Sequence, residues 1–131
     1  VDLPESYIEQ GDYFPAETSY EAACRLLELP DRPTAIFCCN DLSAVSTYRA
    51  AREHKIPLPK QLSVMGFDDI FPADQLMPSL TSVHQPFSEI AQRAVQMIID
   101  NRNDNPGDMH AILPTNVVIR ESTVPPQSSA R

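Results

Sequence analysis

Apolar residues follow two alternating patterns along the chain: short runs that are mostly apolar, and longer stretches with helical spacing. The short runs are residues 34–39, 63–67, 80–83 and 116–119. The longer stretches, in which apolar residues recur every three or four positions, are residues 20–27, 44–51 and 87–101. The first pattern predicts strands and the second predicts amphipathic helices. Strands that alternate with helices indicate an α/β fold, with a mostly parallel, Rossmann-like sheet and helices on both of its faces.

The composition fits one globular domain and argues against two classes of partner. With 131 residues and 42% apolar side chains, the chain can bury a core. Its formal charge of -8 has the wrong sign for a surface that follows a phosphate backbone, so these residues are not expected to hold DNA themselves. No stretch approaches the roughly 20 apolar residues that cross a bilayer, so no membrane association is predicted. The odd set of cysteines, Cys24, Cys38 and Cys39, favours a reducing, cytoplasmic compartment.

Acidic residues follow two successive predicted strands, as Asn40-Asp41 and as Asp68-Asp69. In an open parallel sheet, ligands bind beyond the carboxyl ends of the strands, so these side chains are candidates for a binding site. Their carboxylates accept hydrogen bonds from hydroxyl groups, which suits a polyhydroxylated small molecule. The alternative is structural, because an Asp at the start of a helix caps free N–H groups and contributes about 1 kcal/mol. Spacing alone leaves both interpretations open.

Signals of catalysis and of cofactor binding are weak. The three histidines, His54, His84 and His110, lie far apart in the sequence and show no metal-ligand spacing. No Gly-x-Ser-x-Gly turn supports a nucleophilic serine, and three glycines do not make a phosphate-binding loop. We therefore predict a binding protein that is not an enzyme and that carries neither a metal nor a cofactor.

Three ordered segments closely resemble the LacI/GalR family of bacterial transcription regulators. These segments are residues 32–41 (RPTAIFCCND), 62–69 (LSVMGFDD) and 78–86 (PSLTSVHQP). Shorter matches near the two ends are residues 11–13 (GDY), 20–23 (YEAA), 113–115 (LPT) and 118–123 (VIREST). The resemblance covers nearly everything except the tail, and several motifs in consistent order make it specific.

The resemblance implies a type I periplasmic-binding-protein-like fold, in which two α/β lobes close on a ligand. Residues 1–86 and 110–124 are expected to belong to the carboxy-terminal lobe, and residues 87–109 to a crossover helix of the amino-terminal lobe. Residues 125–131 are expected to be a disordered tail. The DNA-binding helix-turn-helix head and most of the first lobe are expected to lie outside this sequence.

The resemblance also implies ligand-binding residues at the crossing between the lobes. Asp41 matches the family's effector-binding aspartate, and the same carboxylate can cap the following helix. Gln85 resembles a position that lines the cleft, and it can instead satisfy backbone groups of the hinge. Phe87 resembles a position that supplies an apolar wall, and it can instead belong to the core.

Two further parts of the site follow from the resemblance. An aromatic residue after Gly11 faces the ligand in relatives, and here either Tyr13 or Phe14 takes that role, because the segment is one residue longer than usual. Asp68 is expected either to brace the strand end or to contact the ligand. The predicted site thus contains no catalytic residue and no metal ligand.

The family resemblance implies a sensor whose output is binding. A small-molecule effector, a sugar or a related metabolite, favours one arrangement of the lobes and so controls operator DNA through the absent head. A homodimer is expected, because paired heads read a two-fold symmetric operator. The alternative function is an exported sugar-binding protein of an uptake system, which shares the fold. Studied alone, this chain is expected to swap domains or to pair in a non-native way through the apolar face of residues 88–101.

Overall fold

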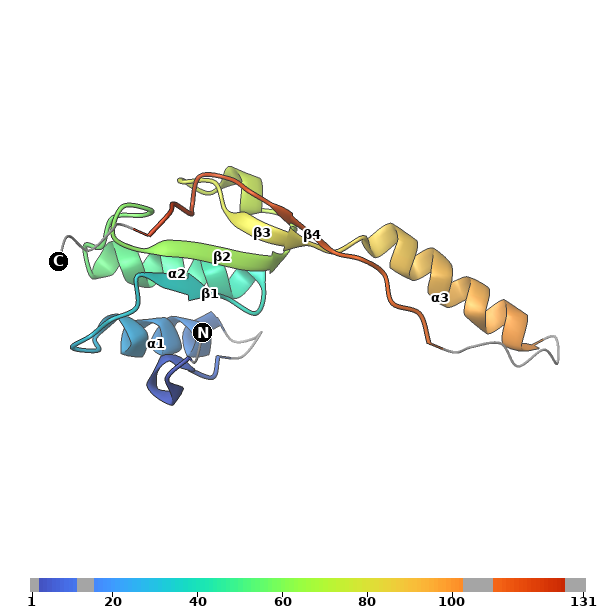
Figure 1. Ribbon diagram of the computed structural model, residues 1–131, viewed down its shortest axis with the longest axis horizontal. Helices are drawn as coiled ribbons and strands as arrows, with labels where there is room; N and C mark the ends of the chain where they lie inside the picture. Colours follow the sequence, from blue (N-terminus) through green and yellow to red (C-terminus); the bar gives the residue numbers. More distant parts are fainter. Residues whose placement is uncertain (1–2, 12–15, 103–109, 127–131) are drawn as a thin grey trace.

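The structure is a computed structural model that describes residues 3–11, 16–102 and 110–126. Its helices and strands follow the order that the sequence predicts. They are η1 (Glu5–Tyr7), α1 (Ala16–Leu27), β1 (Ala35–Phe37), α2 (Asp41–Glu53), β2 (Ser63–Asp68), η2 (Ala73–Gln75), β3 (Thr81–His84), α3 (Phe87–Arg102) and β4 (Asn116–Val118). Figure 1 shows a layered body and, projecting from it, an arm that contains α3. The predicted α/β class is confirmed.

The sheet holds its strands in the order β1-β2-β3-β4. β2 runs parallel to β1 and to β3, whereas β4 runs antiparallel to β3. The register of β2 and β3 sets Asp68 beside His84 at the carboxyl ends of the two strands. Polar residues that are distant in the sequence therefore meet at this edge of the sheet, where ligands bind in open parallel sheets.

The core lies between one face of the sheet and the helices α1 and α2, which pack against each other (Figure 1). Leu62, Val64 and Leu80 are fully buried there. Removing a large aliphatic side chain from water contributes about 1.5–3 kcal/mol. Alanines of α2 let the helix approach the sheet closely, because their side chains are short. Ala44, Ala50 and Ala51 are all fully buried.

The start of α2 is fixed by a cap, which answers one of the questions left open by the sequence. Asn40 has an extended backbone, and its Oδ1 accepts a hydrogen bond from the Ser43 N–H at 2.8 Å. The capping role considered for Asp41 therefore falls to its neighbour, and that interpretation of Asp41 was wrong. The Asp41 side chain instead points away from the helix end, toward β3.

The first strand differs from its prediction. The continuous apolar run at residues 34–39 predicts burial on both faces, yet only Ile36 of β1 is buried, and Phe37 is 61% exposed. The reason is that β1 is the edge strand of the described sheet, and α1 and α2 cover the face on which Ile36 lies. The opposite face of β1 carries no covering helix within the described residues.

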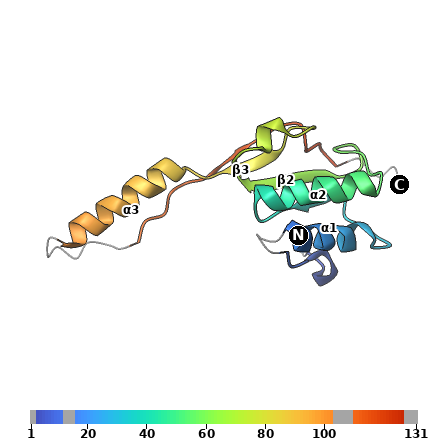
Figure 2. The same cartoon turned by 180° about the vertical axis from the view of Figure 1, so that it is seen from behind.

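The arm formed by α3 lies apart from the body in both views (Figures 1 and 2). Several of its apolar side chains, Ile90, Val95, Ile98 and Ile99, are exposed. These residues share the helical spacing of an amphipathic face, which is the pattern that predicted the helix. Within the described part of the chain, no helix combines the length and the hydropathy that crossing a membrane requires.

Candidate functional site

The strand ends bring together two of the residues predicted to bind ligand. Asp68 ends β2, and Gln85 directly follows β3. The Gln85 side-chain amide donates to Asp68 Oδ1 at 2.6 Å, and the Gln85 backbone N–H donates to the Asp68 carbonyl at 3.4 Å. Both residues are partly exposed. Both side chains therefore keep acceptor and donor capacity beyond their mutual bond, at the carboxyl ends of the strands.

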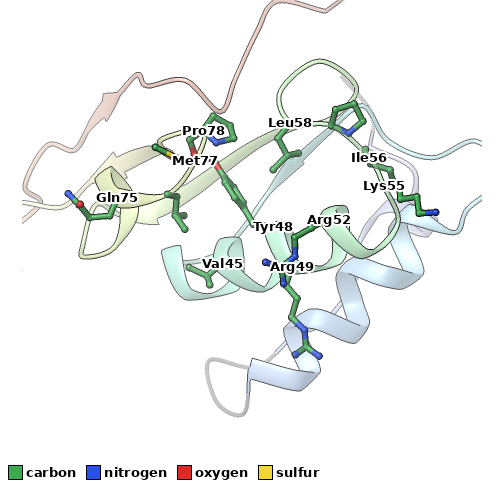
Figure 3. Close-up of a pocket in the computed structure, with 12 residues that line it drawn as sticks. Val45, Tyr48, Arg49, Arg52, Lys55, Ile56, Leu58, Gln75, Met77 and Pro78 are labelled. Atoms are coloured by element: carbon green, nitrogen blue, oxygen red, sulfur yellow. Dashed lines mark hydrogen bonds between the residues drawn. The ribbon is translucent and has the colours of Figure 1, made fainter.

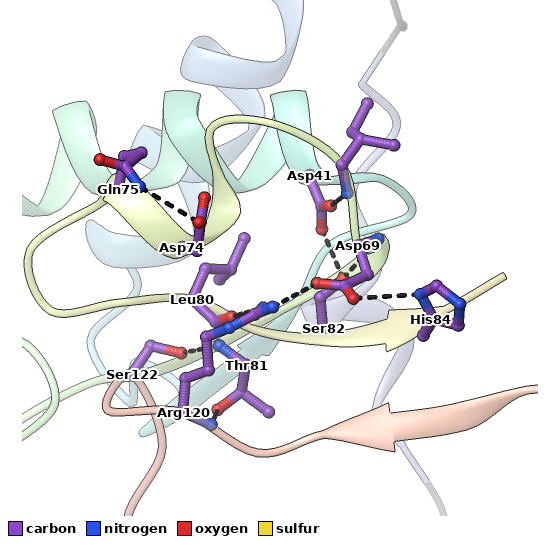
Figure 4. Close-up of polar contacts among 11 residues, drawn as sticks. Asp41, Asp69, Asp74, Gln75, Leu80, Thr81, Ser82, His84, Arg120 and Ser122 are labelled. Atoms are coloured by element: carbon purple, nitrogen blue, oxygen red, sulfur yellow. Dashed lines mark hydrogen bonds and ion pairs between the residues drawn. The ribbon is translucent and has the colours of Figure 1, made fainter.

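Asp41 is held inside the body, away from this surface. Its side chain is fully buried, the Ser82 hydroxyl donates to Oδ1 at 2.6 Å, and the Ile70 N–H donates to Oδ2 at 2.8 Å. Figure 4 shows the carboxylate between β3 and the loop that follows β2. This geometry does not fit the predicted direct contact with a ligand, because both oxygens are engaged within the chain and no surface is open. Asp41 ties α2 to the strand ends that carry the site.

The electrostatics of Asp41 agree with a structural role. Burial raises the pKa of the Asp41 carboxyl above its usual range, because a charge is poorly solvated there. The hydrogen bonds from Ser82 and Ile70 act in the opposite direction, and the charges of Asp68 and Asp69 raise the pKa further. A carboxyl with neighbours of the same charge needs these donors in place if it is to stay ionised.

A second carboxylate, that of Asp69, joins three segments of the chain. Arg120, which follows β4, donates to Asp69 Oδ1 at 2.6 Å, and His84 Nδ1 lies 3.1 Å from Asp69 Oδ2 (Figure 4). Arg120 also donates to the Leu80 carbonyl at 2.7 Å. The Asp69 side chain is 12% exposed and that of Arg120 is 20% exposed, so water screens this ion pair only in part.

The remaining residues that were predicted to bind ligand lie either at the start of the arm or outside the residues that the structure describes. Phe87 begins α3, donates its N–H to the Gln85 carbonyl at 2.9 Å, and is 48% exposed. It therefore stands next to the Asp68 and Gln85 pair as an apolar surface rather than as core. Tyr13 and Phe14 lie outside the described residues.

Residues 1–123 match the family described as the periplasmic binding protein-like domain. The chain belongs to this family. The HTH-type transcriptional repressor PurR of Escherichia coli O139:H28 is 37% identical over 109 residues, which make up 81% of this chain and 32% of that repressor. The chain thus spans about a third of the length of the curated relatives that it matches.

Solved structures of regulators share the fold of this periplasmic binding protein-like domain. The transcriptional regulator CelR in its complex with cellobiose matches with a TM-score of 0.85 and 27% identity, over 92% of this chain and 37% of that chain. A dimeric Lac repressor with an 11-residue C-terminal deletion matches with a TM-score of 0.81 and 26% identity, over 89% and 43% of the two chains. These findings confirm the resemblance to LacI/GalR regulators that the sequence motifs indicate.

Sequence reasoning missed two residues that shape the site of this periplasmic binding protein-like domain. Ser82 and Arg120 were assigned only to a strand and to a family motif, yet Ser82 donates to the Asp41 carboxylate and Arg120 donates to that of Asp69.

The two adjacent cysteines, which the sequence places in one apolar run, differ in burial. Cys38 is buried, and burial raises the pKa of its thiol to about 12, whereas Cys39 is exposed at the carboxyl end of β1. Strand alternation was the available signal, because it places one of two adjacent cysteines outside the core.

A hollow on the surface lies away from this site. It has a volume of about 790 Å³ and lies between α2 and the segment before β3, lined by Tyr48, Arg52 and Met77 among others (Figure 3). Residues 55–58, at its other end, precede β2, so the hollow lies toward the amino ends of the strands. Ligands of periplasmic binding protein-like and other open α/β folds are expected at the opposite edge, where Asp68 lies.

Proposed function

We propose that the chain is the effector-binding and pairing part of a LacI/GalR-type transcriptional repressor that senses a small polar metabolite, a sugar. The observation that carries the proposal is the Asp68 and Gln85 pair, which joins the ends of two parallel strands and remains accessible. The identity to a transcriptional repressor supports a sensor over an enzyme or a transport protein.

The proposal assigns the chain to the two lobes as follows. Residues 1–86 and 110–124 form the carboxy-terminal lobe, and residues 87–109 reach into the amino-terminal lobe of the longer protein. The projection of α3 from the body supports this division, because a helix with exposed apolar side chains needs a partner surface (Figure 1). The helix-turn-helix head precedes both lobes and makes the contacts with operator DNA.

Recognition of a sugar follows from the chemistry of the site. The Asp68 carboxylate accepts hydrogen bonds from ligand hydroxyls, and the Gln85 amide both donates and accepts. Phe87 offers an apolar face at the same crossing, against which the C–H face of a sugar ring packs. Asp41 contributes indirectly, because its carboxylate holds Ser82 and the loop after β2 in place. Paired polar groups beside one apolar surface are typical of small-molecule sites.

The mechanism is a shift between two arrangements of the lobes. The effector binds one arrangement better than the other, and this differential affinity sets how the paired heads meet a two-fold symmetric operator. The protein acts in the cytoplasm, where the operator is. No covalent chemistry is needed, so the output is the change in DNA affinity.

Pairing of two copies is proposed on the side away from the strand ends. Residues 21–29 and residues 72–77 are the proposed contributors. Met77 is 93% exposed beside the hollow next to α2 (Figure 3). Phe71, one residue before the second segment, is also exposed. Exposed apolar side chains next to a concave surface are typical of interfaces.

The test is a ligand screen on the longer protein that contains this chain. Pentoses, hexoses, disaccharides, polyols and purines are screened by thermal shift and then by calorimetry. A ligand at 100 times its Kd adds about 2.7 kcal/mol of stability, which such a screen detects. We expect a sugar to stabilise the protein, Asp68→Ala to abolish the effect, and Asp31→Ala to retain it. Asp31 is a matched control, because it is exposed, lies outside both proposed pairing segments, and accepts the hydrogen bond from Tyr7 through its backbone carbonyl, which alanine keeps.

Each unfavourable outcome removes a different part of the proposal. If no compound stabilises the protein, the sensor function is wrong. If a purine is bound in place of a sugar, the sensor stands and the ligand class is wrong. If binding survives Asp68→Ala, the assignment of the site is wrong.

A further inference from the structure

The turn at the end of β2 has an unusual backbone. Asp68 has a φ of 106° and Asp69 a φ of 57°. Side chains with a Cβ rarely adopt positive φ, and two such residues in succession persist only where their surroundings hold them. The direction of the Asp68 carboxylate depends on this turn, because its own φ is one of the two unusual angles.

Interactions from three directions hold the turn. The Asp69 N–H donates to the Ser82 hydroxyl at 3.2 Å, and the following N–H, of Ile70, donates to Asp41 at 2.8 Å. The Asp69 carboxylate is held by His84 at 3.1 Å and by Arg120 at 2.6 Å. Of these anchors, only the guanidinium is permanently charged and able to bind a carboxylate strongly.

Arg120 reaches the turn from a distant part of the chain. It follows β4, the strand that returns from the arm, and its backbone N–H donates to the Thr81 hydroxyl at 2.9 Å. Its side chain is clamped by a second bond, to the Leu80 carbonyl at 2.7 Å. The guanidinium thus bridges the Leu80 carbonyl, just before β3, and the Asp69 carboxylate, as Figure 4 shows.

We propose that Arg120 is a positioning residue for ligand binding: through Asp69 it holds the strained turn, and so it aims the Asp68 carboxylate at Gln85 and at the ligand. The inference rests on the proposed function, because it assigns the contact with the ligand to Asp68. It adds that the segment returning from the arm controls the geometry of the binding residue. Movement of that segment then alters ligand affinity without any contact between Arg120 and the ligand.

The experiment combines crystal structures with binding, on the longer protein that contains this chain. The variants are Arg120→Met, Asp69→Gly and the double variant. Arg32→Met is the matched control, since Arg32 also donates to a backbone carbonyl, that of Gln61, but lies away from the turn. Affinity is measured for whichever compound of the screen binds the wild type most tightly.

We expect Arg120→Met to return Asp69 to negative φ, to break the bond between Asp68 and Gln85, and to weaken binding at least tenfold. The control variant is expected to bind within twofold of the wild type. Glycine adopts a φ of 57° without strain, so the turn no longer needs the anchor when residue 69 is glycine. Adding Arg120→Met to Asp69→Gly is therefore expected to change affinity by less than threefold, a coupling that general loss of stability does not produce.

The proposal is overturned if crystals of Arg120→Met keep both positive φ angles and the bond between Asp68 and Gln85. It is also overturned if Arg120→Met weakens binding as strongly in the Asp69→Gly background as in the wild type. If the wild type binds no compound, the proposed function fails. The crystal structures then still decide whether Arg120 holds the turn.

Discussion

Gly66, in the middle of β2, lies against the carboxylate that ties α2 to the site. A Cβ added at Gly66 would be 2.2 Å from Asp41 Oδ1 and 2.9 Å from Leu80 Cδ2. The Leu80 methyl is the end of a side chain and can shift, but the carboxylate is fixed by its bonds to Ser82 and Ile70. We predict that Gly66→Ala expels the Asp41 carboxylate from its place.

The cost of Gly66→Ala follows from the contacts that are lost. A broken hydrogen bond to a charged group costs about 1.5–3 kcal/mol, and overpacking of a core costs about 1–3 kcal/mol. We therefore expect the free energy of unfolding to fall by about 3–5 kcal/mol, which is a large part of the stability of a typical domain. In urea, with a slope of about 2 kcal/mol/M, the midpoint is expected to fall by roughly 2 M.

The assay is urea unfolding followed by circular dichroism, on wild type, Gly66→Ala, Asp41→Ala and the double variant. Truncation of Asp41 opens the space that the new methyl needs, so the double variant is expected to be more stable than additivity predicts, by at least about 1 kcal/mol. A loss below about 1 kcal/mol for Gly66→Ala would refute the reasoning, and additive losses would show that Asp41 is not the group displaced.

Three other changes test the fold. Ser122→Ala removes the hydroxyl that donates to the Val64 carbonyl at 2.6 Å and accepts from the Thr81 N–H at 2.8 Å; urea unfolding is expected to show a loss of about 2–4 kcal/mol, against no measurable loss for the exposed Ser88→Ala. Leu62→Ala is expected to cost about 2–5 kcal/mol in the same assay, since this side chain is fully buried. The Ala50 carbonyl and the Glu28 carboxylate raise the pKa of His54, so the contribution of His54 to stability is complete below pH 6.5 and is lost as pH rises through the raised pKa. His54→Gln is expected to reduce the dependence of Tm on pH in that window. A Tm that varies with pH as in the wild type would contradict the assignment.

The elements could be predicted from the sequence because their signals are local. Helical spacing over residues 87–101 predicts α3, and the apolar run at residues 63–67 predicts β2. The burial of β1 could not be predicted in the same way. An apolar run is compatible with two covered faces, but the exposure of Phe37 depends on which elements lie beside an edge strand.

The location of the binding site could be predicted from the sequence, but the contacts within it could not. Strand order brings Asp68 beside His84 and Gln85, and this follows once the parallel sheet is recognised. The environment of the Asp41 side chain does not follow from the parallel sheet. Whether its carboxylate faces the cleft or the core depends on Ser82, which is 41 residues away, and on the path of the loop after β2. Such long-range partners leave no periodic signal in the sequence.

The attachment of the arm has a mechanical consequence. The chain leaves the body through β3 and returns through β4, and the ladder between these strands pairs Ser82 with Val118 and His84 with Asn116. β3 is also bonded to β2 along its length, so this ladder belongs to the sheet of the body and fixes where both crossings begin: the chain leaves after His84 and returns before Asn116. The two crossing segments therefore cannot separate where they join the body unless backbone pairs of this ladder break.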